Sequence, residues 1–88
     1  MRDHVAAEVT VRYFAGARAV TGVDEERVDL PDGVPVGVLA EELARRHGDA
    51  LGRVLAVATF LVDEVASPPG RPVPSGAVVD VLPPFAGG

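Results

Sequence analysis

The sequence predicts an α+β domain in which a mixed sheet of four to five strands packs one main helix on one face. Two patterns predict this class. Segments with the two-residue alternation of strands occupy both ends of the chain, and only one segment between them has the 3.6-residue periodicity of a helix. That helix therefore serves as the crossover between strands of one sheet. A chain of 88 residues favours a single domain with one modest core.

The first predicted elements form a hairpin. Residues 1–7 show no periodicity and are predicted to be a flexible N-terminus ahead of a domain spanning 8–82. Residues 8–14 alternate, and one side of this strand is predicted to face the core: Val9, Val11 and Tyr13. The small, glycine-punctuated segment 15–23 is predicted to be a loop, and 26–30 alternates again as the second strand.

The segment 36–48 is the predicted helix. Its apolar stripe follows helical spacing and consists of Val36, Leu39, Ala40, Leu43, Ala44 and His47. The pairs Glu41–Arg45 and Glu42–Arg46 have the favoured i,i+4 order, and Gly48 suits the position that ends a helix.

Two or three strands follow the helix. Residues 54–62 form an apolar run whose β-branched and aromatic content predicts a largely buried strand. Residues 71–73 allow a short edge strand. The last strand is predicted at 77–82, where Asp80 faces away from its two valine neighbours.

Composition excludes several classes of function. The chain has no cysteine, which excludes disulfides, thiolate metal sites and a cysteine nucleophile. Eight arginines against thirteen acidic residues give a net charge of −5, which argues against nucleic-acid binding. The longest apolar run is far shorter than the ~20 residues that span a bilayer. We therefore expect a cytoplasmic protein with no nucleic-acid or membrane partner.

Signatures of catalysis and of cofactor binding are missing from the sequence. No glycine-rich nucleotide-binding motif occurs, so we expect no cofactor on this chain alone. His4 and His47 are far apart in sequence, and a cation at the end of a helix accounts for His47, so no metal site is predicted. The acidic run 24–26 is predicted to be a solvated face rather than an acid–base pair.

The C-terminal segment 83–88 is the feature with chemical meaning. Pro83 and Pro84 stiffen the chain into an extended stem directly after the last strand. Gly87 and Gly88 carry no side chains. An extended tip of this kind can enter a narrow tunnel and expose its terminal carboxyl carbon to attack.

Three segments resemble the MoaD/ThiS family of ubiquitin-like sulfur carriers, which have the β-grasp fold, and in particular the molybdopterin synthase small subunits. They are the first strand with its Tyr13-Phe14-Ala15 end, the helix 36–48, and the Pro-Pro-x-x-Gly-Gly tail at 83–88. The resemblance covers residues 8–88. It implies a protein that is no enzyme by itself and acts as the sulfur-donor subunit of a sulfurtransferase complex.

The resemblance also implies a mechanism centred on Gly88, with Gly87 beside it. A MoeB/ThiF-like adenylating enzyme uses ATP to activate the terminal carboxylate, and sulfur from a persulfide then displaces AMP to give a thiocarboxylate. The tail next enters the large MoaE-like subunit of molybdopterin synthase, with which these carriers form a heterotetramer. There it donates sulfur to the dithiolene of molybdopterin. ATP is thus bound by the partner and not by this chain.

Strand parity, combined with the strand order of the implied fold, predicts a docking surface. If the core-facing side of the first strand meets the helix, apolar side chains from three strands lie together on the open face of the sheet beside the tail. The resemblance implies that these residues and the tail contact the large subunit. The predicted contact residues are Phe14, Leu61, Leu82, Pro83, Pro84, Phe85 and Ala86.

Other functions share this fold and tail. A sulfur carrier for thiamine or cysteine biosynthesis would differ only in the acceptor enzyme. A ubiquitin-like modifier would form isopeptide bonds to lysines of target proteins. A plain interaction module would keep its function after Gly88 is deleted.

Overall fold

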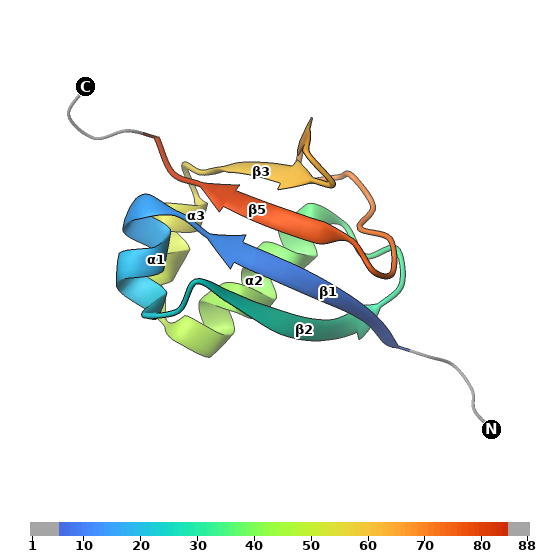
Figure 1. The fold of residues 1–88 in the computed structure, drawn as a ribbon, viewed down its shortest axis with the longest axis horizontal. Coiled ribbons are helices and arrows are strands. Elements are labelled where there is room, and N and C mark those ends of the chain that lie inside the picture. Colours follow the sequence, from blue (N-terminus) through green and yellow to red (C-terminus); the bar gives the residue numbers. More distant parts are fainter. Residues whose placement is uncertain (1–5, 85–88) are drawn as a thin grey trace.

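A computed structural model of the chain describes residues 6–84, with side chains from Glu8 onward. It contains five strands and three helices in these residues, and Figure 1 shows the helices on one side of a single sheet. The elements are β1 Ala6–Tyr13, α1 Ala15–Thr21, β2 Glu25–Pro31, α2 Val36–His47, α3 Asp49–Leu55, β3 Thr59–Val62, β4 Val65–Ser67 and β5 Val78–Leu82. The predicted α+β class is confirmed.

The sheet has the strand order β2-β1-β5-β3-β4. The central pair, β1 and β5, runs parallel, and every other pair is antiparallel. Because β1 and β5 are parallel neighbours, their carboxyl ends meet at the same edge of the sheet. The chain therefore leaves β5 at the edge where α1 follows β1 (Figure 1).

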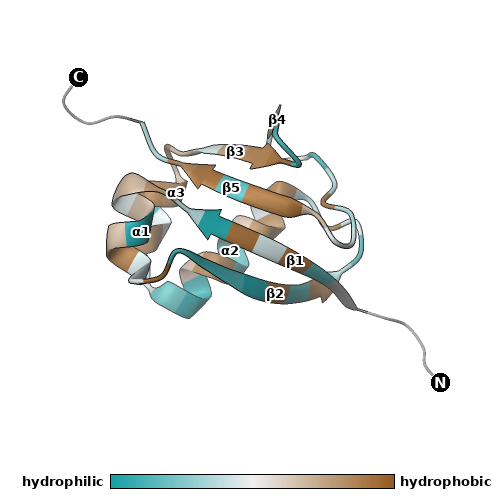
Figure 2. Cartoon of the chain, viewed as in Figure 1, coloured by the Kyte–Doolittle hydropathy of each residue, from teal (hydrophilic) through white to brown (hydrophobic). Residues whose placement is uncertain are grey.

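The core lies between the sheet and α2, as the parity of the strands predicts. The alternate residues of β1 that were expected to face inward are all buried, as are the two valines that flank Asp80 in β5. From α2, the side chains of Val36, Leu39 and Leu43 complete this layer. Figure 2 shows the resulting pattern, in which β5 is apolar along most of its length and β2, at the sheet edge, is mainly hydrophilic.

The segment predicted as the loop 15–23 is in part a helix, so that prediction was wrong for α1. The helix is rich in alanine, ends at Gly22 with a left-handed φ of 78°, and buries the side chain of Ala17. Alanine has the highest helix propensity, and burial of one face supplies the rest of the stability. Seven residues are too few to show a helical periodicity in the sequence.

The apolar run 54–62 was wrongly predicted to be one strand. Its first two residues belong to α3, which buries Leu51 and Leu55 at i,i+4 spacing, and β3 begins only at Thr59. The run is therefore divided between two elements that each bury part of it, Leu55 from α3 and Phe60 and Val62 from β3, while Val57 between them is 64% exposed.

The edge strand expected at 71–73 lies elsewhere, in β4. After β3 the chain turns sharply at Asp63 and Glu64, which both have left-handed φ angles, of 48° and 72°. The returning residues pair with β3 as β4. In the segment 71–73 only Pro72 forms an isolated bridge, to Pro35.

Two further details differ from expectation. The strand β1 begins at Ala6 rather than Glu8, because Ala6 and Ala7 already pair with the end of β2. The helix α2 has the predicted stripe, and Gly48 follows it with φ 96°. Arg45, however, pairs with Glu42 at 2.5 Å instead of with Glu41.

No helix within residues 6–84 combines the length and the apolar character that crossing a membrane requires.

Candidate functional site

The root of the tail is the first part of the candidate site. Leu82 ends β5, Pro83 is half-buried against the domain, and Pro84 is exposed. The described part of the tail, Pro83 and Pro84, thus follows directly from the end of β5. The predicted functional residues Phe85, Ala86, Gly87 and Gly88 lie outside the described residues.

The second part is the open face of the sheet, which no helix covers. Leu61 and Leu82 lie on this face because their neighbours in β3 and β5 point into the core. In the antiparallel pair of these strands, Leu82 is opposite Thr59 and Leu61 is opposite Asp80. The two leucines are therefore diagonal neighbours on one face, at the spacing at which apolar side chains interact. Both are half-buried.

Phe14 extends this surface towards α1. Its backbone is extended (φ −125°, ψ 152°), so it points to the opposite side from Tyr13, and its side chain is 40% exposed. Because Tyr13 is level with Val81 in the parallel pair, the next residues, Phe14 and Leu82, are also level. The structure thus brings the three residues of the predicted docking surface to one face at the tail root. We call Phe14, Leu61 and Leu82 the tail-root patch.

An ion pair adjoins the tail-root patch, and the sequence interpretation missed it. Arg12 donates from Nε to Asp80 Oδ1 at 2.6 Å and from Nη2 to Oδ2 at 3.0 Å. The hydrogen bonds and the charge of Asp80 raise the pKa of the Arg12 guanidinium above its ordinary value. Parity had placed both residues on the open face of neighbouring strands, which was the available signal for their pairing.

A second polar cluster, on the core side of the sheet, joins β1, β2 and the end of α2. Tyr13 donates its hydroxyl hydrogen to Glu26 Oε2 at 2.5 Å, and His47 Nε2 lies 2.5 Å from the same oxygen. Arg46 donates to Oε1 at 3.3 Å. Glu26 is therefore a partly buried structural acceptor, and the prediction that the whole run 24–26 is solvated was wrong at this residue.

The pKa values in this cluster follow from its contacts. Burial alone would raise the pKa of Glu26, but the hydrogen bonds from Tyr13 and His47 and the charge of Arg46 outweigh it, so the pKa lies below the ordinary value. Burial, followed by the hydrogen bond to Glu26, raises the pKa of Tyr13 far above its ordinary value. Both shifts stabilise the protonation states found at neutral pH.

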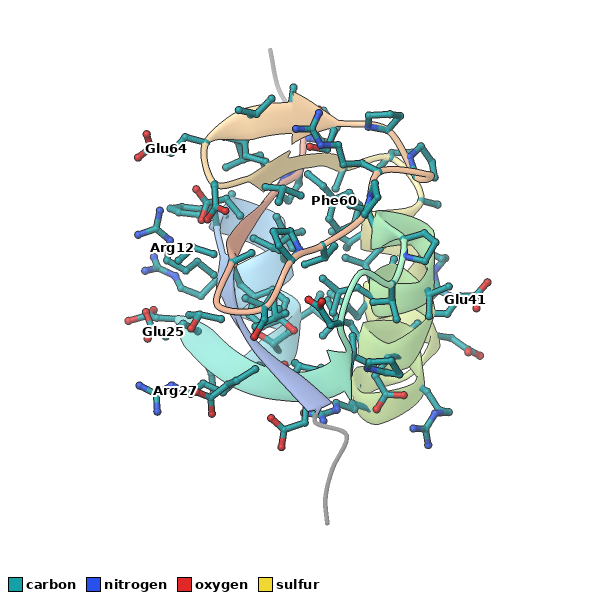
Figure 3. All side chains as sticks on the ribbon, turned by 90° about the vertical axis from the view of Figure 1, so that its right-hand side faces the viewer. Arg12, Glu25, Arg27, Glu41, Phe60 and Glu64 are labelled. Atoms are coloured by element: carbon teal, nitrogen blue, oxygen red, sulfur yellow. The ribbon has the colours of Figure 1, made fainter. Side chains whose placement is uncertain are left out.

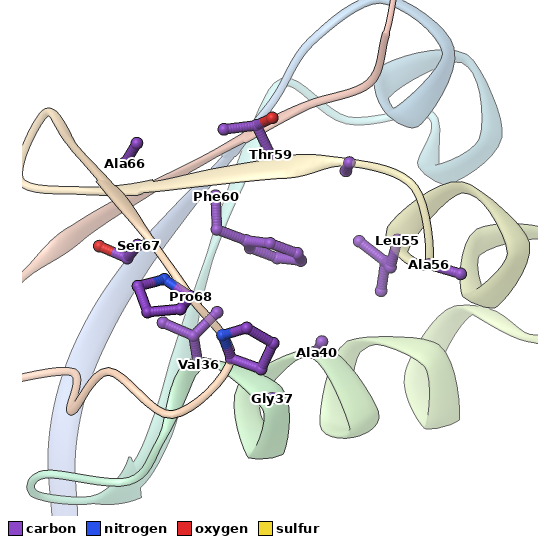
Figure 4. A pocket seen from close by; sticks show the side chains of 12 residues that line it. Val36, Gly37, Ala40, Leu55, Ala56, Thr59, Phe60, Ala66, Ser67 and Pro68 are labelled. Atoms are coloured by element: carbon purple, nitrogen blue, oxygen red, sulfur yellow. The ribbon is translucent and has the colours of Figure 1, made fainter.

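A groove lies on the other side of the sheet, between α2, the end of α3 and the strands β3 and β4 (Figure 4). Its volume is about 490 Å³, and none of its lining side chains is titratable. Figure 4 shows Phe60 and Leu55 facing Pro68 and Val36 across it. Such a lining can accept apolar groups, and the polar side chains in it are the hydroxyls of Thr59 and Ser67.

Nothing in the described part of the chain supports a metal centre. Within it, no three His, Asp or Glu side chains gather in a way that could hold a metal ion. His47 is engaged by Glu26, and His4 lies outside the described residues.

The parallel central strands, the crossover helix α2 and the final strand that continues into a tail define a ubiquitin-like protein of the β-grasp class. Its distinctive surface is the tail-root patch on the open face of the sheet. The chain belongs to the ThiS family, whose model matches residues 11–88.

Three relatives illustrate this membership. The chain is 30% identical over 83 residues to the molybdopterin synthase sulfur carrier subunit of Chlamydomonas reinhardtii, a match that covers 92% of this chain and 99% of the relative. It is similar to the structure of a Pyrococcus furiosus protein assigned as molybdopterin converting factor subunit 1 (32% identity, TM-score 0.80, covering 90% and 99% of the chains). It is also similar to SAMP1, the small archaeal modifier protein 1 of Haloferax volcanii (26% identity, TM-score 0.81, covering 92% and 99%).

Proposed function

We propose that the chain is a sulfur carrier that serves as the small subunit of a molybdopterin synthase. The observation that carries the proposal is the continuation of β5 into Pro83 and Pro84 beside the tail-root patch, in a chain whose sequence ends in Gly-Gly. The membership of the ThiS family and the similarity to a molybdopterin synthase sulfur carrier subunit support it.

The chemistry takes place at the terminal carboxylate of Gly88. A free carboxylate is a poor electrophile, so a MoeB/ThiF-like enzyme joins it to AMP from ATP with release of pyrophosphate. A persulfide sulfur then attacks the acyl carbon and AMP leaves. A thiol cleaves the resulting S–S bond, which leaves the terminal thiocarboxylate on the carrier and a disulfide on the donor.

The chain supplies position rather than catalysis. Its role is to hold the reactive terminus at the end of a stiff stem, while ATP and the pterin precursor are bound by its partners. We propose that the tail-root patch docks on the large, MoaE-like subunit and that the tail from Pro83 to Gly88 threads into that subunit's active site, within a heterotetramer. These reactions are cytoplasmic.

The direct test is the intact mass of the chain after incubation with ATP, its adenylating enzyme and a persulfide donor. We expect one oxygen to be exchanged for sulfur at the C-terminus. A chain that ends at Gly87 is the matched control, because its carboxylate falls about 3.4 Å short of the reactive position. If the wild-type chain never gains sulfur, the proposal is wrong.

A second function, protein modification, is favoured by the similarity to small archaeal modifier protein 1. It predicts isopeptide bonds between the terminal glycine and lysines of cellular proteins. Immunoblots of cells that express the wild-type chain would show a ladder that disappears when Gly87 and Gly88 are deleted. Restoration of molybdopterin synthesis without such a ladder would favour the carrier function alone.

A further inference from the structure

A buried charge occupies an unusual position in this fold, on the open face of the sheet rather than in the core. Asp80 is only 6% exposed, and it is the one charged residue that is buried among those whose side chains the structure describes. No helix covers this face, so Asp80 is buried by neighbouring side chains of the same face. Arg12, whose side chain is 43% exposed, engages both carboxylate oxygens of Asp80.

Stability of the fold does not account for this pair. Of the two charges only that of Asp80 is withdrawn from water, which is unfavourable, and replacing a buried ion pair with apolar side chains of similar size is often neutral or stabilising. On the open face Asp80 has Val78, Leu61 and Leu82 as neighbours, so an apolar residue would fit the pattern at that position, whereas Arg12 lies between Asp80 and Glu25. What the pair does provide is a guanidinium that is fixed in place beside the tail-root patch.

The guanidinium still has donors to offer. Its bonds to Asp80 use Nε and Nη2, and no hydrogen bond from Nη1 is formed within the described part of the chain. Arg12 lies in the same row of the sheet as Leu61, because Asp80 pairs with Arg12 on one side and with Leu61 on the other. A partner that covers the patch would therefore also cover Arg12 and remove water from Nη1.

The charges near Arg12 restrict what a partner can place there. Glu25 lies opposite Arg12 on β2, and the charges of Glu25 and Glu64 both act on the guanidinium. Figure 3 shows these three side chains and Arg27 projecting from one side of the sheet, with Glu41 on the far side. Asp80 already neutralises Arg12, so an added carboxylate would meet two acidic neighbours. A neutral oxygen acceptor meets no such repulsion.

We propose that Arg12, positioned by Asp80, is a specificity determinant of the docking surface. It selects a partner that presents an apolar contact interrupted by one neutral oxygen acceptor, a main-chain carbonyl or a side-chain amide, opposite Nη1. It rejects a wholly apolar partner surface, since that surface would leave the guanidinium desolvated and unpaired. The inference rests on the proposed function, because it assigns the chemistry of the partner that binds the tail-root patch.

The test measures the affinity of the full chain for the large molybdopterin synthase subunit of the same organism by titration calorimetry. In the variant R12L/D80L the ion pair becomes an apolar pair. We expect it to melt at or above the wild-type temperature and to bind about tenfold or more weakly, which is the effect of losing a hydrogen bond to a charged group. Wild-type affinity in this variant would overturn the inference and leave the proposed function intact.

Two further variants keep the test decisive. R12K retains an ion pair with Asp80 but has no second nitrogen to present, so a merely structural role predicts wild-type affinity and the proposal predicts weaker binding. If the leucine pair does not fold, R12Q/D80N replaces the charges by amides and is expected to bind several-fold more weakly. A large subunit that does not bind the wild-type chain at all would overturn both the inference and the proposed function.

Discussion

The hydroxyl of Tyr13 donates a 2.5 Å hydrogen bond to the carboxylate of Glu26, which links the central strand β1 to the edge strand β2. The same oxygen lies 2.5 Å from Nε2 of His47, at the end of α2. The rings of Tyr13 and His47 meet edge to face, with their centroids 5.9 Å apart. One carboxylate thus joins the two layers of the fold, at the edge of the sheet where α1 and α2 end.

Replacing Glu26 by Gln is expected to destabilise the domain by about 1–3 kcal/mol, because the partly buried Tyr13 hydroxyl and His47 ring lose their charged partner. Urea unfolding followed by circular dichroism measures this change. Glu25→Gln is the matched control, since Glu25 is the adjacent, exposed residue of the same strand. Equal effects from the two variants would show that the cluster contributes nothing specific.

The cluster also predicts loss of stability in acid. Because the pKa of Glu26 is lower in the folded chain than its ordinary value of 4.5, the unfolded chain takes up a proton first as the pH falls. The contribution of Glu26 is therefore complete above pH 4.5 and is lost as the pH falls through the folded-state pKa. Between neutral pH and pH 3, the free energy of unfolding should fall less steeply with decreasing pH for Glu26→Gln than for the wild type. The same dependence of the free energy of unfolding on pH in both proteins would contradict the lowered pKa of Glu26.

A separate loss is expected in alkali, and it depends on Tyr13. The pKa of Tyr13 is raised in the folded chain, so above its ordinary value of 10.0 the unfolded chain ionises first and is favoured. Stability should then fall steadily with rising pH above about 10. Tyr13→Phe should be less stable at neutral pH but should lack this alkaline dependence, which thermal unfolding monitored between pH 8 and 11 would reveal. A wild-type chain without the alkaline decline would contradict the prediction.

The sequence predicts those strands and helices that are long enough to repeat their characteristic spacing of apolar residues several times. Seven alternating residues at 8–14 and twelve helical residues in α2 define their buried faces, and the structure confirms both. The helices α1 and α3 have seven residues each, which is two turns, so their apolar positions do not establish a period. The short strand β4 depends on the turn at Asp63 and Glu64, whose left-handed φ angles are uncommon for residues other than glycine.

Contacts between distant segments explain the remaining differences at the candidate site. Arg12 and Asp80 are 68 positions apart, and Glu26 and His47 are 21 apart. Parity places each residue on a face but gives no register between strands, so pairing across the sheet is undetermined by the sequence alone. The tail-root patch was accessible to prediction because it requires only parity and the neighbouring positions of three strands.

The tail-root patch predicts variants that lose binding without unfolding. Phe14→Asp and Leu82→Asp place a charge in the proposed contact with the large subunit, and each is expected to weaken binding at least tenfold. Their melting temperatures should stay near the wild-type value, with the smaller change for the more exposed Phe14. Val81→Asp, one residue before Leu82 but fully buried, is the control that should unfold the domain. Comparable destabilisation by all three would show that the patch is part of the core.

The stem of the tail predicts an effect on activation without an effect on the fold. Pro84 is exposed and follows the half-buried Pro83, so Pro84→Gly removes no described contact and only frees the backbone. Ordering that backbone in the adenylating enzyme would then cost about 0.4–1 kcal/mol more, which corresponds to a roughly twofold to fivefold higher KM for the carrier. Pyrophosphate exchange measures this KM, and unfolding should be unchanged. Pro68→Gly, in the wall of the groove on the other side of the sheet, is the matched control and should leave the KM at the wild-type value. An unchanged KM for Pro84→Gly would mean that the stiffness of the stem plays no part in presenting Gly88.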